Sequence, residues 1–239
     1  MKRAKHRSAT RLPRGEGRRR RRRPAHPDLA RFLALSEAGA RNAATALSQI
    51  LGRPLRLAVP WARILPLNKV KEIAGGPSLV VGALSLRVYG EARGNLLVVF
   101  PREQLRTLLD MVVPRHWPAG RAREAGLLLG DMERSALMEI GNILACAYLN
   151  ALSHLLGVSL LPSIPGLAID MVGAVTDHIL VEMAAESDTA LVLACQVLEP
   201  ESGLRGSIFF LPHAAALSLF ARSTPLAATT GGRRRAAGK

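Results

Sequence analysis

The 239-residue chain has few aromatic side chains, few cysteines and no long uninterrupted apolar run. Aromatic residues are 4% of the chain although hydrophobic residues are 49%, so a core must consist mainly of Leu, Val, Ile and Ala. The longest apolar candidate, residues 155–175, is interrupted by Gly157, Pro162, Pro165 and Asp170, and is too broken for a helix that crosses a membrane. The sequence therefore predicts a globular protein without a membrane span.

Sequence features of metal and nucleotide sites are missing as well. The two cysteines, Cys146 and Cys195, lie in apolar runs, which favours buried, inert thiols in a reducing compartment and a cytoplasmic location. No histidine stands at metal-ligand spacing from either cysteine, and no glycine-rich loop ends in the Lys-Ser or Lys-Thr of a phosphate-binding loop. We therefore expect no metal site and no cofactor of the protein's own.

Acidic residues are scarce at the two ends of the chain. The formal net charge of +15 divides into +11 for residues 1–25, which include an arginine tract at 18–23, and +4 for residues 233–239. The stretch between them is neutral and has no electrostatic footprint for nucleic acid. The basic ends could bind nucleic acid or an acidic membrane surface, could be self-repelling extensions, or could reflect an upstream start that the cell does not use. We expect disordered tails at 1–27 and 223–239 and no specific nucleic-acid partner.

Helical and strand patterns alternate between these tails. Helices are expected at residues 28–51, 68–74, 101–111, 131–156, 171–183 and 212–222, strands at 55–60, 79–89, 95–100, 191–198 and 206–211, and a short extended piece at 160–161. Asp28 and Asp131 are expected to cap the two long helices. A polar segment containing Pro and Gly, residues 114–126, separates the two halves of the chain.

The two halves follow the same order of elements. Gly52 and Gly157 are 105 residues apart, as are Pro60 and Pro165, and the sequence around each pair is similar. An internal duplication is therefore predicted, with repeats at residues 28–113 and 127–222 inside one domain, 28–222. Because strands joined by tight turns pair antiparallel, the fold class is α+β: a pseudo-two-fold, two-layer domain of duplicated helix-strand-helix-hairpin-helix units, with an antiparallel sheet and long helices on one face.

Three polar side chains project from one face of the helix expected at 131–156. At about 100° per residue, Ser135, Glu139 and Asn142 lie within about 60° of one another and opposite an apolar stripe. A plain solvated helix face would show the same arrangement. Their spacing to a later proline is more specific: Ser135-x3-Glu139-x2-Asn142-x22-Pro165.

This pattern resembles the signature of the CheC-type chemotaxis phosphatases, which include CheX and FliY. The surrounding segments at 136–145 and 168–175 also resemble that family, and residues 42–49 resemble its N-terminal repeat. The resemblance covers about residues 28–222. It implies hydrolysis of the aspartyl phosphate of a CheY-like response regulator, with a divalent metal, expected to be magnesium, held by the regulator. It also makes the receptor deamidase CheD a candidate partner.

The resemblance implies a role for each of the four positions. Asn142 would orient a water molecule in line with the phosphorus, which suits an acyl phosphate because this group is already activated and needs positioning more than a base. Glu139 would pair with a lysine of the partner's active site. Ser135 and Pro165 would belong to the partner-binding surface: Ser135 would contact the partner, and Pro165 would shape the turn that follows it.

The first repeat departs from this pattern. Counting back from Pro60 places Ala30, Ala34 and Glu37 at the positions of Ser135, Glu139 and Asn142. Ala34 cannot form the ion pair, and the carboxylate of Glu37 would repel phosphoryl oxygens. We therefore expect one working site, in the second repeat, and a degenerate first repeat.

A non-catalytic binding or scaffold module is the competing hypothesis. FliM-like flagellar switch proteins are similar in fold but lack the Glu and Asn pair, and a CheC-type protein could act chiefly by binding CheD. The presence of both Glu139 and Asn142 favours the phosphatase.

Overall fold

Seven strands form one antiparallel sheet in the computed structural model, which describes residues 37, 40, 41, 44, 45, 47–49, 51–112, 129–216, 218 and 219. The strands are β1 (Arg56–Pro66), β2 (Val80–Gly90), β3 (Gly94–Pro101), β4 (Leu160–Pro162), β5 (Gly166–Met171), β6 (Thr189–Glu199) and β7 (Leu204–Pro212). Their order across the sheet is β1-β6-β7-β3-β2-β4, and β5 also pairs with β2. The predicted α+β class with an antiparallel sheet is confirmed.

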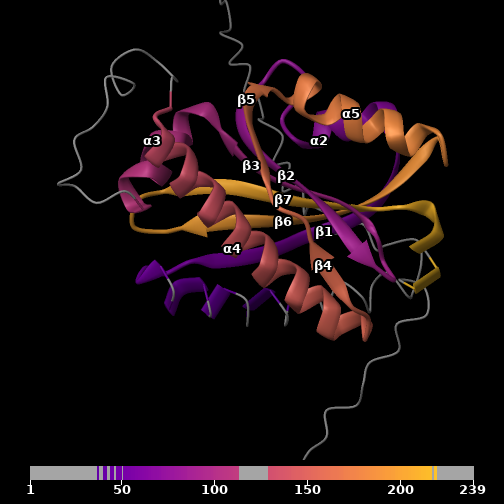
Figure 1. Cartoon of the computed structure of the whole chain (residues 1–239), viewed down its shortest axis with the longest axis horizontal. Coiled ribbons are helices and arrows are strands. Elements are labelled where there is room, and N and C mark those ends of the chain that lie inside the picture. The colour runs from indigo at the N-terminus through magenta and orange to yellow at the C-terminus, as the bar shows by residue number, and fades with distance from the viewer. Residues whose placement is uncertain are drawn as a thin grey trace, which may run out of the picture.

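Helices cover the two faces of this sheet. The long helix α4 (Asp131–Leu156) runs diagonally across one face, where α3 (Arg102–Val112) and the described helical residues between 37 and 51 share its core (Figure 1). The short helix α2 (Val70–Ile73) and α5 (Val172–Ala184) pack on the opposite face. The longest helix thus lies where it was expected, and α5 adds a layer that the two-layer description did not include.

The central strand β3 is buried on both faces. Leu96, Val98 and Phe100 belong to the core under α4, whereas Leu97 and Val99 belong to the core under α5. Because successive strand residues point to opposite faces, a strand covered on both sides reads as a continuous apolar run rather than an alternating one. This explains why the sequence of β3 is uninterruptedly apolar from Leu96 to Phe100.

The two edges of the sheet are built alike. At one edge β1 pairs with β6 of the β6–β7 hairpin, and at the other edge β4 and β5 pair with β2 of the β2–β3 hairpin. The two hairpins meet through the pair β3–β7 at the centre of the sheet. This arrangement is consistent with a duplicated unit, but the predicted repeat and domain boundaries lie among residues outside the described part of the chain and stay predictions.

Several local expectations differ from the structure. Asp131 is the first residue of α4 and not its cap: Gly130 holds the N-cap position, and its N–H donates to the Glu133 carboxylate at 3.0 Å. The short 3-10 helices η1 (Leu67–Lys69) and η3 (Ala214–Ala216) occupy the starts of two expected helices. Strand β1 extends beyond the piece expected at 55–60, because its pairing with β6 continues past Pro60. The short piece expected at 160–161 corresponds to β4, whereas β5 was not expected.

The most apolar long helix of the described residues is α4, and not the stretch at 155–175 that the sequence singled out. By length and composition alone this helix is long and apolar enough to cross a membrane. In the structure its apolar stripe is buried against the sheet instead, through residues that include Leu137, Leu144 and Leu149. The hydropathy of α4 is thus accounted for by its place in the core.

Candidate functional site

The outward face of α4 carries the three polar residues singled out in the sequence. Ser135 and Glu139 are exposed and Asn142 is half-buried, whereas the apolar stripe behind them is buried. Gly141 sits between Glu139 and Asn142 on the side that faces β2, where a Cβ would overlap the side chain of Leu84. The missing side chain lets α4 lie close to β2, which fixes the height of this polar face above the sheet edge.

A short loop between β4 and β5 faces these residues. Strands β4 and β5 both pair with β2, and the three residues Ser163, Ile164 and Pro165 connect them. The side chain of Ile164 is 86% exposed, the highest value among the exposed large hydrophobic residues of the described part. The loop therefore presents an apolar side chain to solvent beside the polar face of α4.

Helix face and loop together enclose an open groove of about 460 Å³. The residues that line it are Ser135, Met138, Glu139, Asn142, Pro162, Ser163, Ile164 and Pro165. All four positions of the spacing pattern thus meet in one groove, across an intervening stretch of 22 residues. The sequence analysis did not identify the other four lining residues, Met138, Pro162, Ser163 and Ile164. An isoleucine between two prolines and next to a serine is nevertheless a signal for an exposed recognition loop.

The charged and amide groups of the groove are open to an outside partner. Within the described ranges, the Glu139 carboxylate has no cationic partner, and the Asn142 side chain has one polar contact, from the Cys146 thiol to Oδ1 at 3.7 Å. The amide nitrogen of Asn142 has no partner among these residues. An unpaired carboxylate and a free amide donor on adjacent turns can bind a cation and a water or oxyanion, respectively.

The two thiols differ in reactivity because of their surroundings. Burial, with a smaller contribution from the charge of Glu139, raises the pKa of Cys146. Burial alone raises the pKa of Cys195 to about 12. Since the thiolate is the reactive form, both thiols are inert near neutral pH, and Cys195 remains so well into the alkaline range.

Thiol labelling should therefore proceed in two separate stages. In folded protein at pH 9, iodoacetamide is expected to modify half-buried Cys146 slowly and to leave Cys195 unmodified, whereas both react quickly in denaturant. Mass spectrometry of the alkylated peptides measures the two rates. Equal labelling of both cysteines in the folded protein would contradict the burial of Cys195 in the core.

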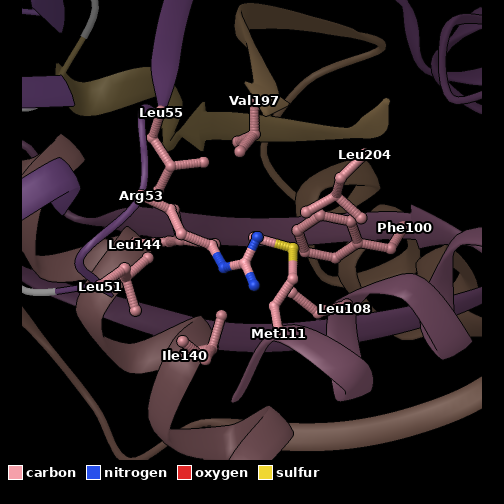
Figure 2. A pocket seen from close by; sticks show the side chains of 10 residues that line it. All are labelled: Leu51, Arg53, Leu55, Phe100, Leu108, Met111, Ile140, Leu144, Val197 and Leu204. Carbon is pink, nitrogen blue, oxygen red and sulfur yellow. The ribbon is translucent and has the colours of Figure 1, made fainter. Parts of the chain in front are cut away.

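A second, enclosed pocket lies between α3, α4 and the N-terminal helical segment, but it is not a ligand site. Its volume is about 20 Å³, which is room for roughly one water molecule. Apolar side chains line it, and the guanidinium of Arg53 extends among them toward Met111 (Figure 2). The pocket is a small packing defect of the core, and the open groove is the candidate site.

The equivalent positions of the first repeat form no comparable arrangement in the described residues. Glu37 is exposed and pairs with Arg41 at 3.4 Å, one turn along its own helix. Pro60 lies within β1, while Ala30 and Ala34 fall outside the described residues. Within those residues, no three His, Cys, Asp or Glu side chains gather as a metal site.

The fold is that of FliY and of the FliM middle domain. Thermotoga maritima FliY superposes with a TM-score of 0.60 at 17% identity, over 82% of this chain and 97% of that one. The FliM middle domain from H. pylori gives a TM-score of 0.57 at 12% identity, over 82% and 98% of the two chains. At these identities the similarity establishes the class of fold.

Sequence comparison identifies the family within this class. Residues 132–169, which include the polar face of α4 and the groove loop, match the model of the CheC-like family. The chain is also 31% identical over 176 residues to "CheY-P phosphatase CheC" of Bacillus subtilis (strain 168), covering 73% of this chain and 82% of that protein. The chain belongs to the CheC-like family.

Proposed function

We propose that this protein is a chemotaxis phosphatase that docks a phosphorylated CheY-like response regulator in the groove and hydrolyses its aspartyl phosphate. The observation that carries the proposal is the convergence of Glu139, Asn142 and Pro165 on one open groove, in a chain of the CheC-like family. The name of the B. subtilis relative, a CheY-P phosphatase, supports this substrate. A phosphate-release assay with phosphorylated regulators tests it.

Asn142 is proposed to position the attacking water. The amide nitrogen donates to the water oxygen, which holds that oxygen in line with the bond from phosphorus to the aspartyl carboxylate. The water oxygen bonds to phosphorus, the phosphorus–carboxylate bond breaks, and the products are a free aspartate and inorganic phosphate. No strong base is required, since the aspartyl carboxylate is already a good leaving group and the water proton can pass to the phosphate oxygens.

Glu139 is proposed to fix the register of the complex. Its exposed carboxylate has no cation partner among the described residues, so it is available to a lysine at the regulator's phosphorylation site. A divalent ion, expected to be magnesium, would belong to the regulator and offset phosphoryl charge there. Ser135 and the exposed Ile164 lie on opposite walls of the groove and would contact the regulator's surface.

One active site is proposed, in the second repeat. Glu37→Ala is expected to leave the rate of phosphate release within about twofold of the parent, because Glu37 is engaged with Arg41 on an exposed helix face. The measurement is a steady-state assay of Glu37→Ala beside the parent protein. A loss of more than tenfold would show that the first repeat takes part in the reaction.

The scaffold alternative makes a different prediction for the same assay. A FliM-like or CheD-binding module would bind its partner and release no phosphate, and the FliM middle domain does share this fold. We favour the phosphatase because Glu139 and Asn142 are both present and both line the groove. We place this activity in the cytoplasm, as the two free thiols and the family membership suggest.

A further inference from the structure

The loop that forms one wall of the groove interrupts the edge of the sheet. On β2, Ser85 pairs with Gly166 of β5 and Val88 pairs with Pro162 of β4. Ser85 and Val88 are three residues apart on β2, whereas their pairing partners Gly166 and Pro162 are four residues apart. The segment between β4 and β5 therefore holds one extra residue. Such a bulge leaves a strand without its regular ladder partner and turns local side chains outward, which places Ile164 in solvent.

Ser163 replaces the hydrogen bond to β2 that the interrupted ladder lacks. Its backbone N–H donates to the carbonyl oxygen of Arg87 at 2.8 Å, and its hydroxyl oxygen accepts from the Arg87 N–H at 3.0 Å. In an uninterrupted ladder a backbone carbonyl would accept this second bond. The hydroxyl also donates to the carbonyl oxygen of Ile164 at 3.0 Å, so it holds β2 on one side and the groove loop on the other.

The first repeat contains the same bulge without this hydroxyl. Strand β1 shifts register against β6 between Ala58 and Trp61, around Pro60, and Ala58 stands 105 residues before Ser163. Ala58 instead pairs directly with Gln196 in the ladder. The hydroxyl is therefore present in the repeat that has Glu139 and Asn142, and absent from the repeat in which both are replaced.

We infer that Ser163 is a positioning residue of the site: its hydroxyl fastens the Ile164–Pro165 wall to β2 and so sets the width of the groove that receives the partner. This inference rests on the proposed function for its partner, a phosphorylated response regulator. Ser163 touches neither the phosphorus nor the attacking water in this account. Its loss should therefore weaken docking and leave the chemical step nearly unchanged.

The test compares Ser163→Ala with Ser163→Thr, which keeps the hydroxyl. In steady-state phosphate release, Ser163→Ala is expected to raise KM for the phosphorylated regulator about 3- to 10-fold, because the groove wall loses both hydrogen bonds of the hydroxyl, with kcat within about twofold. Ser163→Thr is expected to restore KM to within about twofold of the parent. Ser153→Ala is the matched control, because its hydroxyl also donates to a backbone carbonyl, that of Val158, at the far end of α4.

A second readout needs no enzymatic activity. Residue-resolved hydrogen exchange is expected to speed up at the Arg87 amide in Ser163→Ala, which loses its acceptor, and to stay slow in Ser163→Thr. Unchanged hydrogen exchange at the Arg87 amide in Ser163→Ala would contradict the proposal that the Ser163 hydroxyl holds the loop to β2. Faster exchange with an unchanged KM would contradict its role in docking. A parent protein that releases no phosphate from any regulator overturns the proposed function. The exchange data still decide whether the Ser163 hydroxyl holds the loop to β2.

Discussion

Asn142→Ala is expected to lower the phosphate release that this protein stimulates, above the regulator's own rate, at least about 100-fold while leaving the fold intact. The side chain is half-buried at the groove and has one weak contact, with the Cys146 thiol, so its removal opens no cavity in the core. What is lost is the amide that holds the attacking water in line. Asn142→Asp should be similarly inactive, since a carboxylate of the same size has no donor hydrogen and repels the phosphoryl oxygens.

The matched control is Asn150→Ala, an exposed asparagine two turns further along α4 and outside the groove. It should retain the parent rate. Circular dichroism and the thermal midpoint should be unchanged in both variants, which separates a chemical defect from unfolding. An Asn142→Ala protein that keeps more than a tenth of the parent activity would remove Asn142 from the mechanism.

Glu139→Gln should give the second largest effect, by a different route. Replacing the carboxylate by an amide of equal size removes the charge that pairs with the partner's lysine. The expected loss in kcat/KM is about 30-fold, as for charge pairs that become buried on association. Because the interaction is ionic, raising the salt concentration should lower the parent's kcat/KM and reduce the ratio of kcat/KM between the parent and Glu139→Gln.

Glu72→Gln provides the charge-matched control for this variant. Glu72 is an exposed acid on α2, on the opposite face of the sheet from α4, so the substitution changes net charge equally and leaves the groove untouched. Steady-state rates at low and moderate salt measure both variants. Equal salt dependence for the parent and Glu139→Gln would argue against a direct ion pair at Glu139.

Much of the fold could be predicted because its signals are local. The apolar run of β3, the tight turns of the two hairpins and the apolar stripe of α4 each specify an element without reference to distant residues. The 105-residue spacing between similar segments adds the order of the two halves. The capping of α4 was less predictable, since Gly130 serves as its cap and the supporting carboxylate comes from Glu133, three residues further on.

The site was only half predictable, and the reason is its construction. Ser135, Glu139 and Asn142 lie on one helix, so helical periodicity alone brings them together. The opposite wall depends on a bulge at the edge of the sheet, where Ser163 bonds to Arg87, 76 residues earlier in the chain. No local pattern specifies such a pairing, so sequence reasoning assigned Pro165 to a turn and did not reach Ser163 or Ile164.

The most direct measurement of the central claim is phosphate release from a phosphorylated CheY-like regulator with and without this protein. The regulator is phosphorylated by a small-molecule donor in the presence of Mg²⁺, and the donor is then removed. The account predicts that catalytic amounts of the parent protein accelerate phosphate release well above the regulator's own rate, and that the Asn142→Ala variant does not. A parent protein that binds the regulator and leaves its dephosphorylation rate unchanged would contradict the account and support a scaffold role.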